Sequence, residues 1–501
     1  MVQEDAQTLS LQALGLVAKN HATSQTDTQI TGLSVDSRQV KPGHLFAALA
    51  GTQVHGAEFI KYALRMGAGA VLTDAAGANI AARELGEADA ALVISTEPRR
   101  TLAHAAAAWF ARQPSSMIAV TGTNGKTSVA SFARQIWEWL GLRAVNFGTT
   151  GVEGCVSAPL SHTTPEPITL HRLLADLVDQ NVSHAAMEAS SHGLAQFRLD
   201  GVRLSAAGFT NFTQDHLDYH QGFKDYFDAK AGLFNRVLPS DGTAVVNIDD
   251  LKGAEIVAIA ESRGQKVLTV GQHEGASLRL LGQRFDATGQ DVRYAYLGET
   301  YMTRLSLIGG FQASNVLMAA GLVIACGESA AEIFKTLSDL ETVRGRMELA
   351  TTRGNKASVF VDYAHTPDAL KTALCALRPH VLGRLIVVFG AGGDRDRGKR
   401  PLMGAMAAGF ADLAFVTDDN PRSENPADIR AAILEACPNA TEVDDRAAAI
   451  LMGVDALGPG DALLIAGKGH ETGQIIGDDV LAFNDVEQAS IAVAALDGTG
   501  L

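Results

Sequence analysis

The pattern of apolar and polar positions changes its character along the 501 residues of the chain. Residues 1–97 contain short β-like apolar runs separated by helical and Gly-rich segments, which predicts a small α/β domain. Residues 98–344 begin with an Ala-rich helix, and a later part, 266–307, contains alternating segments that predict an antiparallel meander. Residues 345–501 contain four apolar runs with helical segments between them, which predicts a parallel sheet. We therefore expect an α/β protein with three domains that have these boundaries.

A short apolar strand, 117–121, leads directly into a glycine-containing loop and then into a helix with an apolar stripe. Glycines in such a loop let backbone N–H groups crowd an anion, a lysine adds charge, and a hydroxyl can bind Mg²⁺. Val120 stands where longer phosphate loops have their first glycine, so this loop is a short variant. A plain turn is the alternative. We predict that nucleotide phosphates bind to Gly122, Thr123, Asn124, Gly125, Lys126, Thr127 and Ser128.

The composition, with 47% hydrophobic and 19% charged residues, is typical of a globular α/β enzyme. The net charge of -15 argues against nucleic acid or an anionic membrane surface as a partner. The sequence has no run long enough to span a membrane and no apolar export segment. Its four cysteines are scattered, so we expect reduced and mostly buried thiols. These features predict a cytoplasmic protein, which we expect to be a monomer with small-molecule substrates.

Each apolar run of the last domain is followed by a dense polar loop. In open α/β sheets ligands bind at the carboxyl ends of the strands, so we expect the four loops to converge on one site. Arg395 and Arg422 place guanidinium groups in these loops, and Glu471 could receive an ammonium. This combination suits a zwitterionic amino acid, although such charged residues most often form surface salt bridges. The loops comprise residues 362–365, 390–395, 417–422 and 467–471.

Glu188 and His216 each follow a short apolar strand of the central domain. A carboxylate and an imidazole at neighbouring strand ends could ligate a divalent metal near the phosphate loop. Taken singly, either residue is more often an ordinary polar group of a loop. The segment 162–167 offers two threonine hydroxyls in a proline-stiffened loop, and there a ligand site and a plain loop are equal alternatives.

Lys230 lies on the apolar stripe of its predicted helix, which it shares with Phe223, Phe227 and Phe234. An unpaired buried ammonium is costly. In one interpretation the aliphatic stem follows the apolar face and the amine reaches solvent. In the other the amine has a partner or is modified, for example to a carbamate formed with CO₂, which could ligate Mg²⁺.

These motifs resemble those of the Mur ligase family over nearly the full length of the chain. The resemblance implies an N-terminal domain for the UDP end, a central P-loop ATPase domain, and a Rossmann-like C-terminal domain that brings the incoming amino acid. It also implies an ATP-dependent amide ligase that acts on UDP-MurNAc-L-Ala-D-Glu through an acyl phosphate in peptidoglycan precursor synthesis. The motifs, in the family's order, are Val-Thr-Gly-Thr-Asn-Gly-Lys-Thr-Ser, His-Thr-Thr-Pro-Glu, Met-Glu-Ala-Ser-Ser-His-Gly-Leu, Asp-His-Leu-Asp-Tyr-His, Gly-Arg-Met-Glu, Asp-Tyr-Ala-His-Thr-Pro and Gly-Lys-Gly-His-Glu.

The resemblance implies roles for individual residues through their positions in these motifs. For ATP it implies the phosphate loop together with Asn315, Arg346, Asp362 and His365. For the UDP-muramoyl dipeptide it implies Val35, Ser37, Thr163, Thr164, Ser190, Gln196 and Arg198. For Mg²⁺ it implies Thr127, Glu188, His216 and Lys230, with Lys230 carbamylated. The catalytic residues implied are Lys126, His216 and Lys230.

The resemblance further implies meso-diaminopimelate as the amino acid, because Asp-Asn-Pro-Arg marks this specificity in the family. Diaminopimelate differs from lysine by a second carboxylate, which Arg422 can pair. The chain departs from the family pattern at His162, before the paired threonines, and at Thr52. The residues implied for diaminopimelate are Arg395, Asp419, Asn420, Pro421, Arg422, Gly467 and Glu471.

Alternatives of different classes remain on the sequence alone. A lysine-adding ligase or a folylpolyglutamate synthetase would use the same chemistry with another acceptor, and Arg422 argues against both. A nucleotide-dependent switch would need a guanine-reading Asn-Lys-x-Asp motif, which the sequence lacks. An idle paralogue is disfavoured because the expected phosphate and metal residues are present. Since the site is split between domains, we expect domain closure to assemble it.

Overall fold

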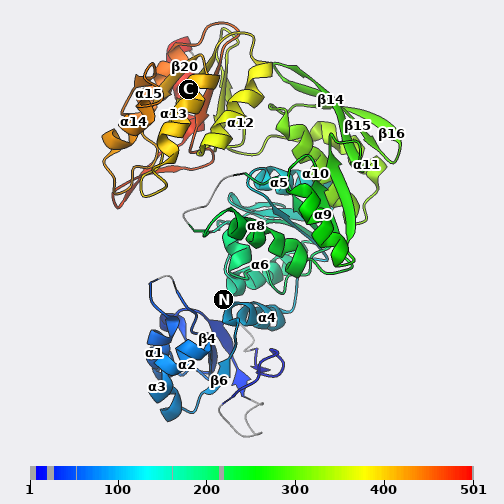
Figure 1. Cartoon of the computed structure of the whole chain (residues 1–501), viewed down its shortest axis with the longest axis vertical. Helices are drawn as coiled ribbons and strands as arrows, with labels where there is room; N and C mark the ends of the chain where they lie inside the picture. The colour runs from blue at the N-terminus through cyan, green and yellow to red at the C-terminus, as the bar shows by residue number, and fades with distance from the viewer. Residues whose placement is uncertain (1–6, 20–27, 52, 161, 214–218, 499–501) are drawn as a thin grey trace. The chain divides into compact units, whose positions relative to one another are not determined.

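The computed structural model describes residues 7–19, 28–51, 53–160, 162–213 and 219–498. They form two compact units, and Figure 1 labels the helices and strands. The first unit comprises residues 1–119, 143–205 and 229–242, and the second comprises the rest of the chain. The division falls within β7 (Ser116–Thr121) and α8 (Phe223–Gly232). The boundaries of the three domains expected from the sequence stay predictions.

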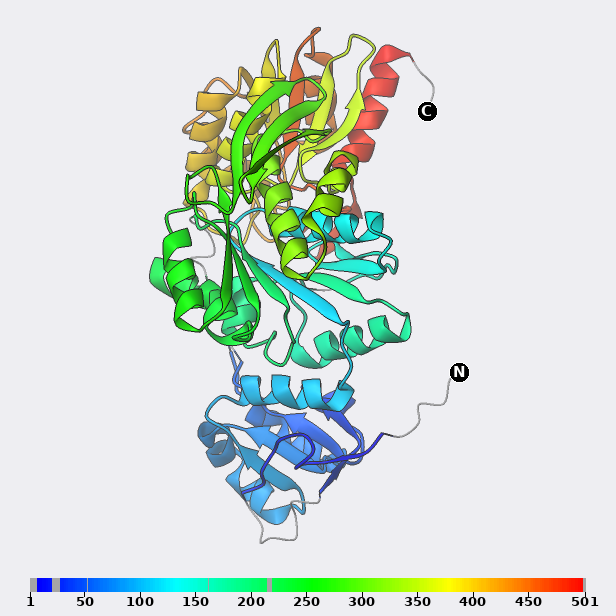
Figure 2. The same ribbon diagram turned by 90° about the vertical axis from the view of Figure 1, so that its right-hand side faces the viewer.

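A parallel sheet of four strands in the order β3-β4-β5-β6 forms the N-terminal part of the first unit. Because successive side chains of a strand point to opposite faces, β4 contributes to two cores. Leu45 packs in one with Trp109 of α4, and Phe46 packs in the other with Ile60 of α1. Helices α4 and α1 accordingly lie on different sides of this sheet (Figure 1, Figure 2). The elements are β1 (Leu9–Ser10), β2 (Gln29–Ile30), β3 (Gly32–Ser34), β4 (His44–Ala47), α1 (Ile60–Arg65), β5 (Ala70–Thr73), α2 (Ala75–Ile80), α3 (Ala82–Glu87), β6 (Ala91–Ile94) and α4 (Pro98–Phe110).

The remainder of the first unit carries strands whose ends hold candidate site residues. β10 (His184–Glu188) pairs in parallel with β8 (Ala144–Gly148), and β8 pairs antiparallel with β9 (Gly151–Gly154). α6 (Pro167–Asp179) begins after Glu166, whose carboxylate accepts the N–H groups of Ile168 and Thr169. The short helix α7 (Ser191–Ala195) follows β10, and a π-helical turn, Leu233–Val237, follows α8.

In the second unit the strands β11 to β14 pair in parallel, and β14, β15 and β16 form an antiparallel meander. The sequence-based start of the meander at Lys266 is wrong, because β13 pairs in parallel with both of its neighbours. The two kinds of strand are hard to separate by pattern alone since both are short and apolar on one face. The elements are α5 (Lys126–Trp139), β11 (Ala206–Phe209), β12 (Thr243–Asn247), α9 (Gly253–Ser262), β13 (Lys266–Gly271), β14 (Leu278–Asp286), β15 (Gly289–Tyr296), β16 (Glu299–Leu305), α10 (Phe311–Ala325) and α11 (Ala330–Thr336).

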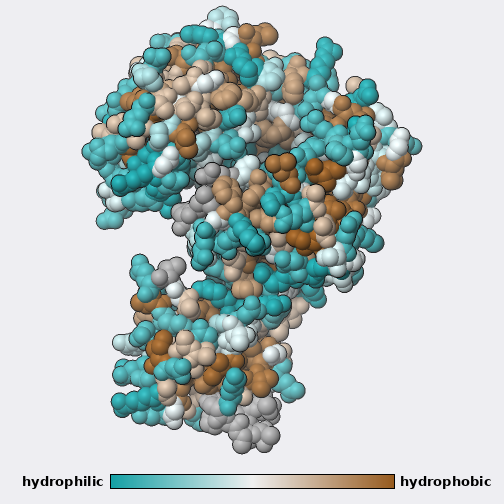
Figure 3. Space-filling view, in the orientation of Figure 1, coloured by the Kyte–Doolittle hydropathy of each residue, from teal (hydrophilic) through white to brown (hydrophobic). Residues whose placement is uncertain are grey.

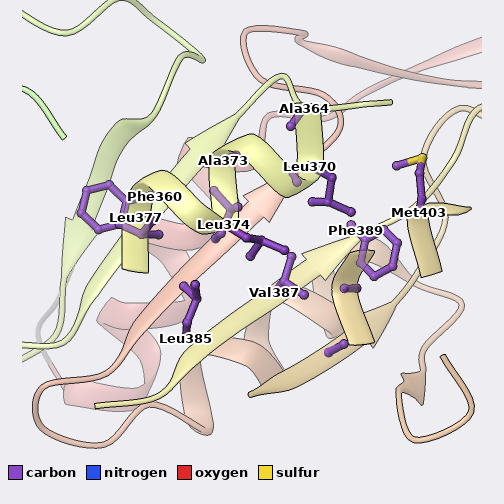
Figure 4. Close-up of a cluster of buried hydrophobic side chains, with 14 of the residues drawn as sticks. Phe360, Ala364, Leu370, Ala373, Leu374, Leu377, Leu385, Val387, Phe389 and Met403 are labelled. Atoms are coloured by element: carbon purple, nitrogen blue, oxygen red, sulfur yellow. The ribbon is translucent and has the colours of Figure 1, made fainter. Parts of the chain in front are cut away.

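The C-terminal part of the second unit is a sheet in the order β17-β18-β22-β19-β20-β21, with only β17 antiparallel to its neighbour. The predicted parallel sheet is thereby confirmed. Val387 and Phe389 of β19 face a core with Leu370 and Leu374 of α12 (Figure 4), and the intervening Val388 faces a second core. The elements are β17 (Glu348–Thr352), β18 (Ser358–Asp362), α12 (Pro367–Leu377), β19 (Leu385–Phe389), α13 (Lys399–Phe410), β20 (Leu413–Val416), α14 (Pro426–Leu434), β21 (Thr441–Glu442), α15 (Arg446–Asp455), β22 (Ala462–Ala466), β23 (Gly473–Ile476), β24 (Asp479–Ala482) and α16 (Asp485–Asp497).

The visible surface is mainly hydrophilic, with hydrophobic residues in small groups among the polar ones (Figure 3). All four cysteines are free, as expected, but the expectation of mostly buried thiols is wrong. Only Cys437 is buried, whereas Cys155 and Cys375 are exposed and Cys326 is partly so. Among the residues that the structure describes, no helix is both long and apolar enough to cross a membrane.

Candidate active site

The predicted phosphate loop lies where expected, between the end of β7 and the first turn of α5. Gly122 has a φ of 147° and Gly125 a φ of 87°, conformations that favour glycine. A Cβ at Gly122 would lie 1.9 Å from Oγ1 of Thr210, so this position has no room for a side chain. The Lys126 ammonium donates to the carbonyl oxygens of Gly122 and Thr123 at 2.9 and 2.8 Å. The loop therefore presents a lysine and the N-terminus of a helix to the same space.

Thr210 and Asn211, directly after β11, hold this loop, a role that was not predicted. The Thr210 hydroxyl donates to the Asn124 carbonyl at 2.6 Å. The Asn124 N–H donates to Oδ1 of Asn211 at 2.9 Å, and the Thr123 N–H donates to the Asn211 carbonyl at 2.9 Å. Their position at the carboxyl end of a strand was the available signal.

Asn315 and Arg346 reach the phosphate loop from other segments of the second unit. Oδ1 of Asn315 lies 2.7 Å from the place of a Cβ at Gly125, so the side chain covers the loop. The guanidinium of Arg346 donates to Oγ1 of Thr127 at 3.2 Å and lies over the Tyr363 ring, 4.5 Å from its centroid. The structure thus brings both predicted ATP residues to the loop.

Asp362 and His365 follow β18 and are tied to the backbone around them. The Asp362 carboxylate accepts the N–H groups of Met347 and Ala364 at 2.7 and 2.9 Å. Burial raises the pKa of Asp362, while Arg346 acts in the opposite direction. Nδ1 of His365 lies 2.8 Å from the Tyr363 carbonyl, to which it donates. Asp362 therefore shapes the turn that carries Arg346, and its contact with ATP stays a prediction.

In the first unit, Glu188 ends β10 and is buried against the turn between β8 and β9. Its Oε1 accepts the Thr149 N–H at 2.7 Å, and its Oε2 accepts the Thr149 hydroxyl at 3.2 Å. The Thr149 hydroxyl also lies 3.2 Å from that of Thr163. Gly148 has no room for a Cβ, which would lie 2.2 Å from Oε1 of Glu188. One carboxylate and two hydroxyls thus share a small space.

Four of the residues implied for the muramoyl dipeptide, Thr164, Ser190, Gln196 and Arg198, form a connected hydrogen-bond network. The buried Thr164 hydroxyl donates to the Glu188 carbonyl at 2.9 Å and lies 3.0 Å from the Ser190 hydroxyl. Ser190 caps α7 by accepting the Gly193 N–H at 3.0 Å. Arg198 donates to the Thr164 carbonyl at 2.6 Å and to Oε1 of Gln196 at 2.8 Å. The network fixes the loop at the end of β10.

Lys230 is only 1% exposed, so the interpretation in which its amine reaches solvent is wrong. Phe227 and Phe234 are buried with it, whereas Phe223 is 50% exposed at the start of α8. The predicted buried stripe of this helix is therefore correct at Phe227, Lys230 and Phe234 and wrong at Phe223. A buried lysine needs a partner or a modification.

His216 lies outside the described residues. Among the residues that are described, no group of three or more His, Cys, Asp or Glu side chains could hold a metal ion. The predicted metal set does not depend on such a cluster, since it includes the hydroxyl of Thr127 and a carbamate on Lys230. Hydroxyl, carboxylate and carbamate oxygens are hard donors of the kind that Mg²⁺ accepts.

Val35 and Ser37 lie directly after β3, at the carboxyl end of the N-terminal sheet. Val35 is 42% exposed. Asp36 accepts the Arg38 N–H at 2.9 Å and pairs with its guanidinium, which lowers the pKa of Asp36 to about 2. The turn thus presents an apolar side chain and a hydroxyl, consistent with a ligand at this edge.

At the carboxyl edge of the C-terminal sheet, Asn420 connects two of the predicted loops. Its Nδ2 donates to Oε2 of Glu471 at 2.9 Å, and its Oδ1 accepts from Nζ of Lys468 at 3.0 Å. Lys468 is wholly buried and also donates to Glu471 at 3.1 Å, a role that was not predicted. Oδ2 of the buried Asp419 has no hydrogen-bond partner among the described residues and lies 2.5 Å from the place of a Cβ at Gly467. Asp419 is therefore available to an ammonium, whereas Glu471 already accepts from Asn420 and Lys468 through its Oε2.

Arg422 and Arg395 lie beside Gly392 at the same edge. Nη1 of Arg422 is 2.9 Å, and Cγ of Arg395 3.9 Å, from the place of a Cβ at Gly392. Nη1 of Arg422 donates to the Gly393 carbonyl at 2.8 Å. Pro421 is buried, and its carbonyl abuts Gly393. The structure thus brings two guanidinium groups and two carboxylates to the ends of β19, β20 and β22, as the sequence predicted.

The chain is similar to known proteins over most of its length. Three family models match in succession: the Mur ligase family catalytic domain at residues 29–110, the Mur ligase middle domain at 120–323, and the Mur ligase glutamate ligase domain at 345–469. The chain is 49% identical to the UDP-N-acetylmuramoyl-L-alanyl-D-glutamate–2,6-diaminopimelate ligase of Bradyrhizobium diazoefficiens, over 93% of this chain and 95% of the relative. It is 50% identical to the ligase of the same name from Caulobacter vibrioides, over 94% and 97%.

A solved structure of a ligase with this name superposes with a TM-score of 0.71 at 31% identity. The alignment covers 98% of this chain and 99% of the solved one. Because identity near one half extends over almost the whole length, the similarity is not limited to the nucleotide-binding motif. The chain belongs to the Mur ligase family.

Proposed function

We propose that this protein joins meso-diaminopimelate to UDP-MurNAc-L-Ala-D-Glu at the expense of ATP, in peptidoglycan precursor synthesis. The relatives that match nearly the full length carry the name of this activity. The observation that carries the assignment is the C-terminal cluster, where Arg422 and Arg395 lie near Asp419 and Glu471. Two cationic and two anionic groups complement an amino acid that has two carboxylates and two amino groups, one of which is the reacting amine.

In the first step, the terminal carboxylate of the UDP-muramoyl dipeptide attacks the γ-phosphorus of ATP. The bond between this phosphorus and the bridging oxygen breaks, ADP leaves, and an acyl phosphate forms. Lys126 stabilises the charge on the transferring group, and the helix N-terminus at Gly125 binds the phosphates. Asn315, Arg346, Asp362 and His365 complete the proposed ATP site.

We propose that Thr127, Glu188, His216 and a carbamate on Lys230 hold Mg²⁺. The ion, when bound, would neutralise negative charge between the phosphates and the attacking carboxylate. The burial of Glu188 and Lys230 supports this assignment, because a carboxylate oxygen and a carbamate oxygen at these shielded positions are hard donors of the kind that Mg²⁺ accepts. The carbamate would form by attack of the neutral Lys230 amine on CO₂ with loss of a proton.

In the second step, the neutral amine of diaminopimelate attacks the acyl carbon, the carbon–oxygen bond to phosphate breaks, inorganic phosphate leaves, and the attacking nitrogen loses a proton to water. Arg422 and Arg395 would hold the carboxylates of the amino acid, and Asp419 and Glu471 would accept from its ammonium. The substrate dipeptide would be held by Val35, Ser37, Thr163, Thr164, Ser190, Gln196 and Arg198.

Lysine has no second carboxylate, so it would leave the guanidinium of Arg422 without its anionic partner. We further propose that the protein acts as a cytoplasmic monomer and that the domains, with boundaries near residues 98 and 345, close over the substrates. Small-angle scattering with and without ATP and the dipeptide tests this closure, and an unchanged radius of gyration would contradict it.

Mass spectrometry of the reaction mixture tests the proposed function directly. Purified protein, ATP, Mg²⁺, UDP-MurNAc-L-Ala-D-Glu and diaminopimelate should yield a product whose mass is the sum of the two substrates minus water. ADP and phosphate should form in equal amounts. Absence of the product, with intact ATP, would contradict the proposal.

A further inference from the structure

The hairpin β23–β24 runs beside the Asp-Asn-Pro-Arg segment 419–422 and is hydrogen-bonded to three of its four residues. Nε2 of Gln474 donates to the Asp419 carbonyl at 2.7 Å, and the Ile475 N–H donates to Oδ1 of Asn420 at 2.9 Å. The Arg422 N–H donates to the Ile475 carbonyl at 3.1 Å. The Gly477 N–H returns a hydrogen bond to the Arg422 carbonyl at 2.8 Å. The first strand and the turn thus run alongside the segment and form hydrogen bonds with Asp419, Asn420 and Arg422.

Arg422 needs this support because its backbone is strained. Its φ is 52°, in the left-handed region that residues other than glycine rarely adopt. Both of its backbone polar groups are bound by the hairpin, and they set the direction in which its side chain leaves the chain. A change in this backbone would therefore move the guanidinium that pairs with the second carboxylate.

The hairpin contributes little to the core of the protein. All four residues of β24 are exposed, including Val480 at 70% and Leu481 at 52%. The four residues of β23 are at most partly buried. An element that buries little apolar surface gains little stability from packing, so its contacts with 419–422 are its principal interactions.

We propose that the β23–β24 hairpin determines selectivity for the distal carboxylate of the amino acid, with Gln474 as a positioning residue. This inference rests on the proposed function and assigns a further part of the same site. Gln474 acts through the backbone of Asp419, and Ile475 and Gly477 act through Asn420 and Arg422. The hairpin also fixes Asn420, whose amide in turn holds Glu471.

The test compares Gln474→Leu with Leu481→Ala. The two residues are opposite each other in the hairpin, but Leu481 lies on the exposed strand. Gln474→Leu removes one hydrogen bond, so the KM for diaminopimelate should rise about fivefold. The kcat and the KM for ATP should stay within about twofold of the wild-type values. The thermal midpoint should stay within about 2 °C of the wild-type value. Leu481→Ala should leave all of these quantities unchanged. Gly477→Ala is a second variant, because a Cβ there meets open space and disturbs only the turn.

The outcomes separate this inference from the function on which it rests. A selective rise in the KM for diaminopimelate, with a smaller preference over lysine, supports the role of the hairpin. If wild type ligates diaminopimelate and Gln474→Leu behaves like Leu481→Ala, the inference is wrong while the proposed function stands. If Gln474→Leu raises the KM for ATP as much as the KM for diaminopimelate and also lowers the thermal midpoint, the hairpin has only a structural role. The inference is then also wrong. If wild type ligates another amine and not diaminopimelate, both proposals fail.

Discussion

Arg446 and Asp485 form a bidentate ion pair in which neither side chain is exposed to solvent. Nε of Arg446 lies 2.8 Å from Oδ1 of Asp485, and its Nη2 lies 2.7 Å from Oδ2. The guanidinium also donates to the Ala466 carbonyl at 3.1 Å and to the Asp418 carbonyl at 3.3 Å. Arg446 therefore connects the ends of β20 and β22 to the start of α16. The loops of the proposed amino-acid site follow these two strands.

Replacement of Asp485 by Ala should destabilise the protein strongly. The change leaves an uncompensated buried guanidinium, which costs about 3–5 kcal/mol. The urea midpoint of the C-terminal unfolding transition measures this loss. Arg83→Ala provides a control, because it breaks the exposed pair with Glu87 and should cost less than about 0.5 kcal/mol. Similar midpoints for the two variants would contradict the structural role of the pair.

Gly122→Ala should weaken ATP binding through steric conflict in the phosphate loop. The new Cβ would meet the Thr210 hydroxyl at 1.9 Å, and the φ of 147° is unfavourable for alanine. We expect the KM for ATP to rise at least about tenfold. Gly141→Ala is a matched control, since Gly141 also has a positive φ of 79° but open space around it. An unchanged KM for ATP in Gly122→Ala would show that this loop does not bind the nucleotide.

Stability should decrease between pH 6.5 and pH 4 because of His171. Burial lowers the pKa of His171 to about 4, and its Nε2 donates to the Asp200 carbonyl at 3.3 Å. The folded state therefore holds this histidine neutral, whereas the unfolded chain binds a proton below pH 6.5. The contribution is complete above pH 6.5 and is lost as the pH falls through 4, with a total of roughly 3 kcal/mol. Denaturant unfolding at several pH values should give a shallower decline for His171→Gln than for wild type, and equal declines would contradict the assignment.

Lys230→Arg should abolish ligation although it keeps the positive charge of an unmodified lysine. Guanidinium does not form the carbamate that the proposed metal site needs, so activity should fall more than about 100-fold. Lys224→Arg is the control on the same helix, because Lys224 is exposed and pairs with Asp228. Carbon-13 NMR of protein kept in labelled bicarbonate should show a carbamate signal in wild type that Lys230→Arg lacks. Full activity of wild type in CO₂-free buffer, without this signal, would contradict carbamylation.

Strong local periodicity made much of the fold predictable. Apolar runs of the last domain form the strands Leu385–Phe389, Leu413–Val416 and Ala462–Ala466, because each is a short apolar run between polar loops. The strand direction of β13 was not predictable, since its pairing partners are chosen by contacts distant in sequence. Buried polar residues were missed for the same reason. Lys468 and Arg446 look like surface residues until the segments that surround them are assembled.

The residues of the site were predictable where a sequence motif is specific for one kind of chemistry. The phosphate loop follows from its glycines and lysine, and the pair of acidic and basic groups at the C-terminal sheet follows from the strand-end rule. The support for these groups was not predictable. Thr210 and Asn211 hold the phosphate loop, and the exposed β23–β24 hairpin holds Arg422, through hydrogen bonds to backbone groups that are distant in the sequence.

The most direct test of the account compares phosphate release with meso-diaminopimelate and with L-lysine, in the presence of ATP, Mg²⁺ and UDP-MurNAc-L-Ala-D-Glu. Wild type should release phosphate rapidly only with diaminopimelate. Arg422→Ala should lose about 1.5–3 kcal/mol of this preference, the value of a hydrogen bond to a charged group, which is about a 10- to 150-fold change. Wild type that prefers lysine, or an Arg422→Ala variant that keeps the full preference, would contradict the role of Arg422 as the selector.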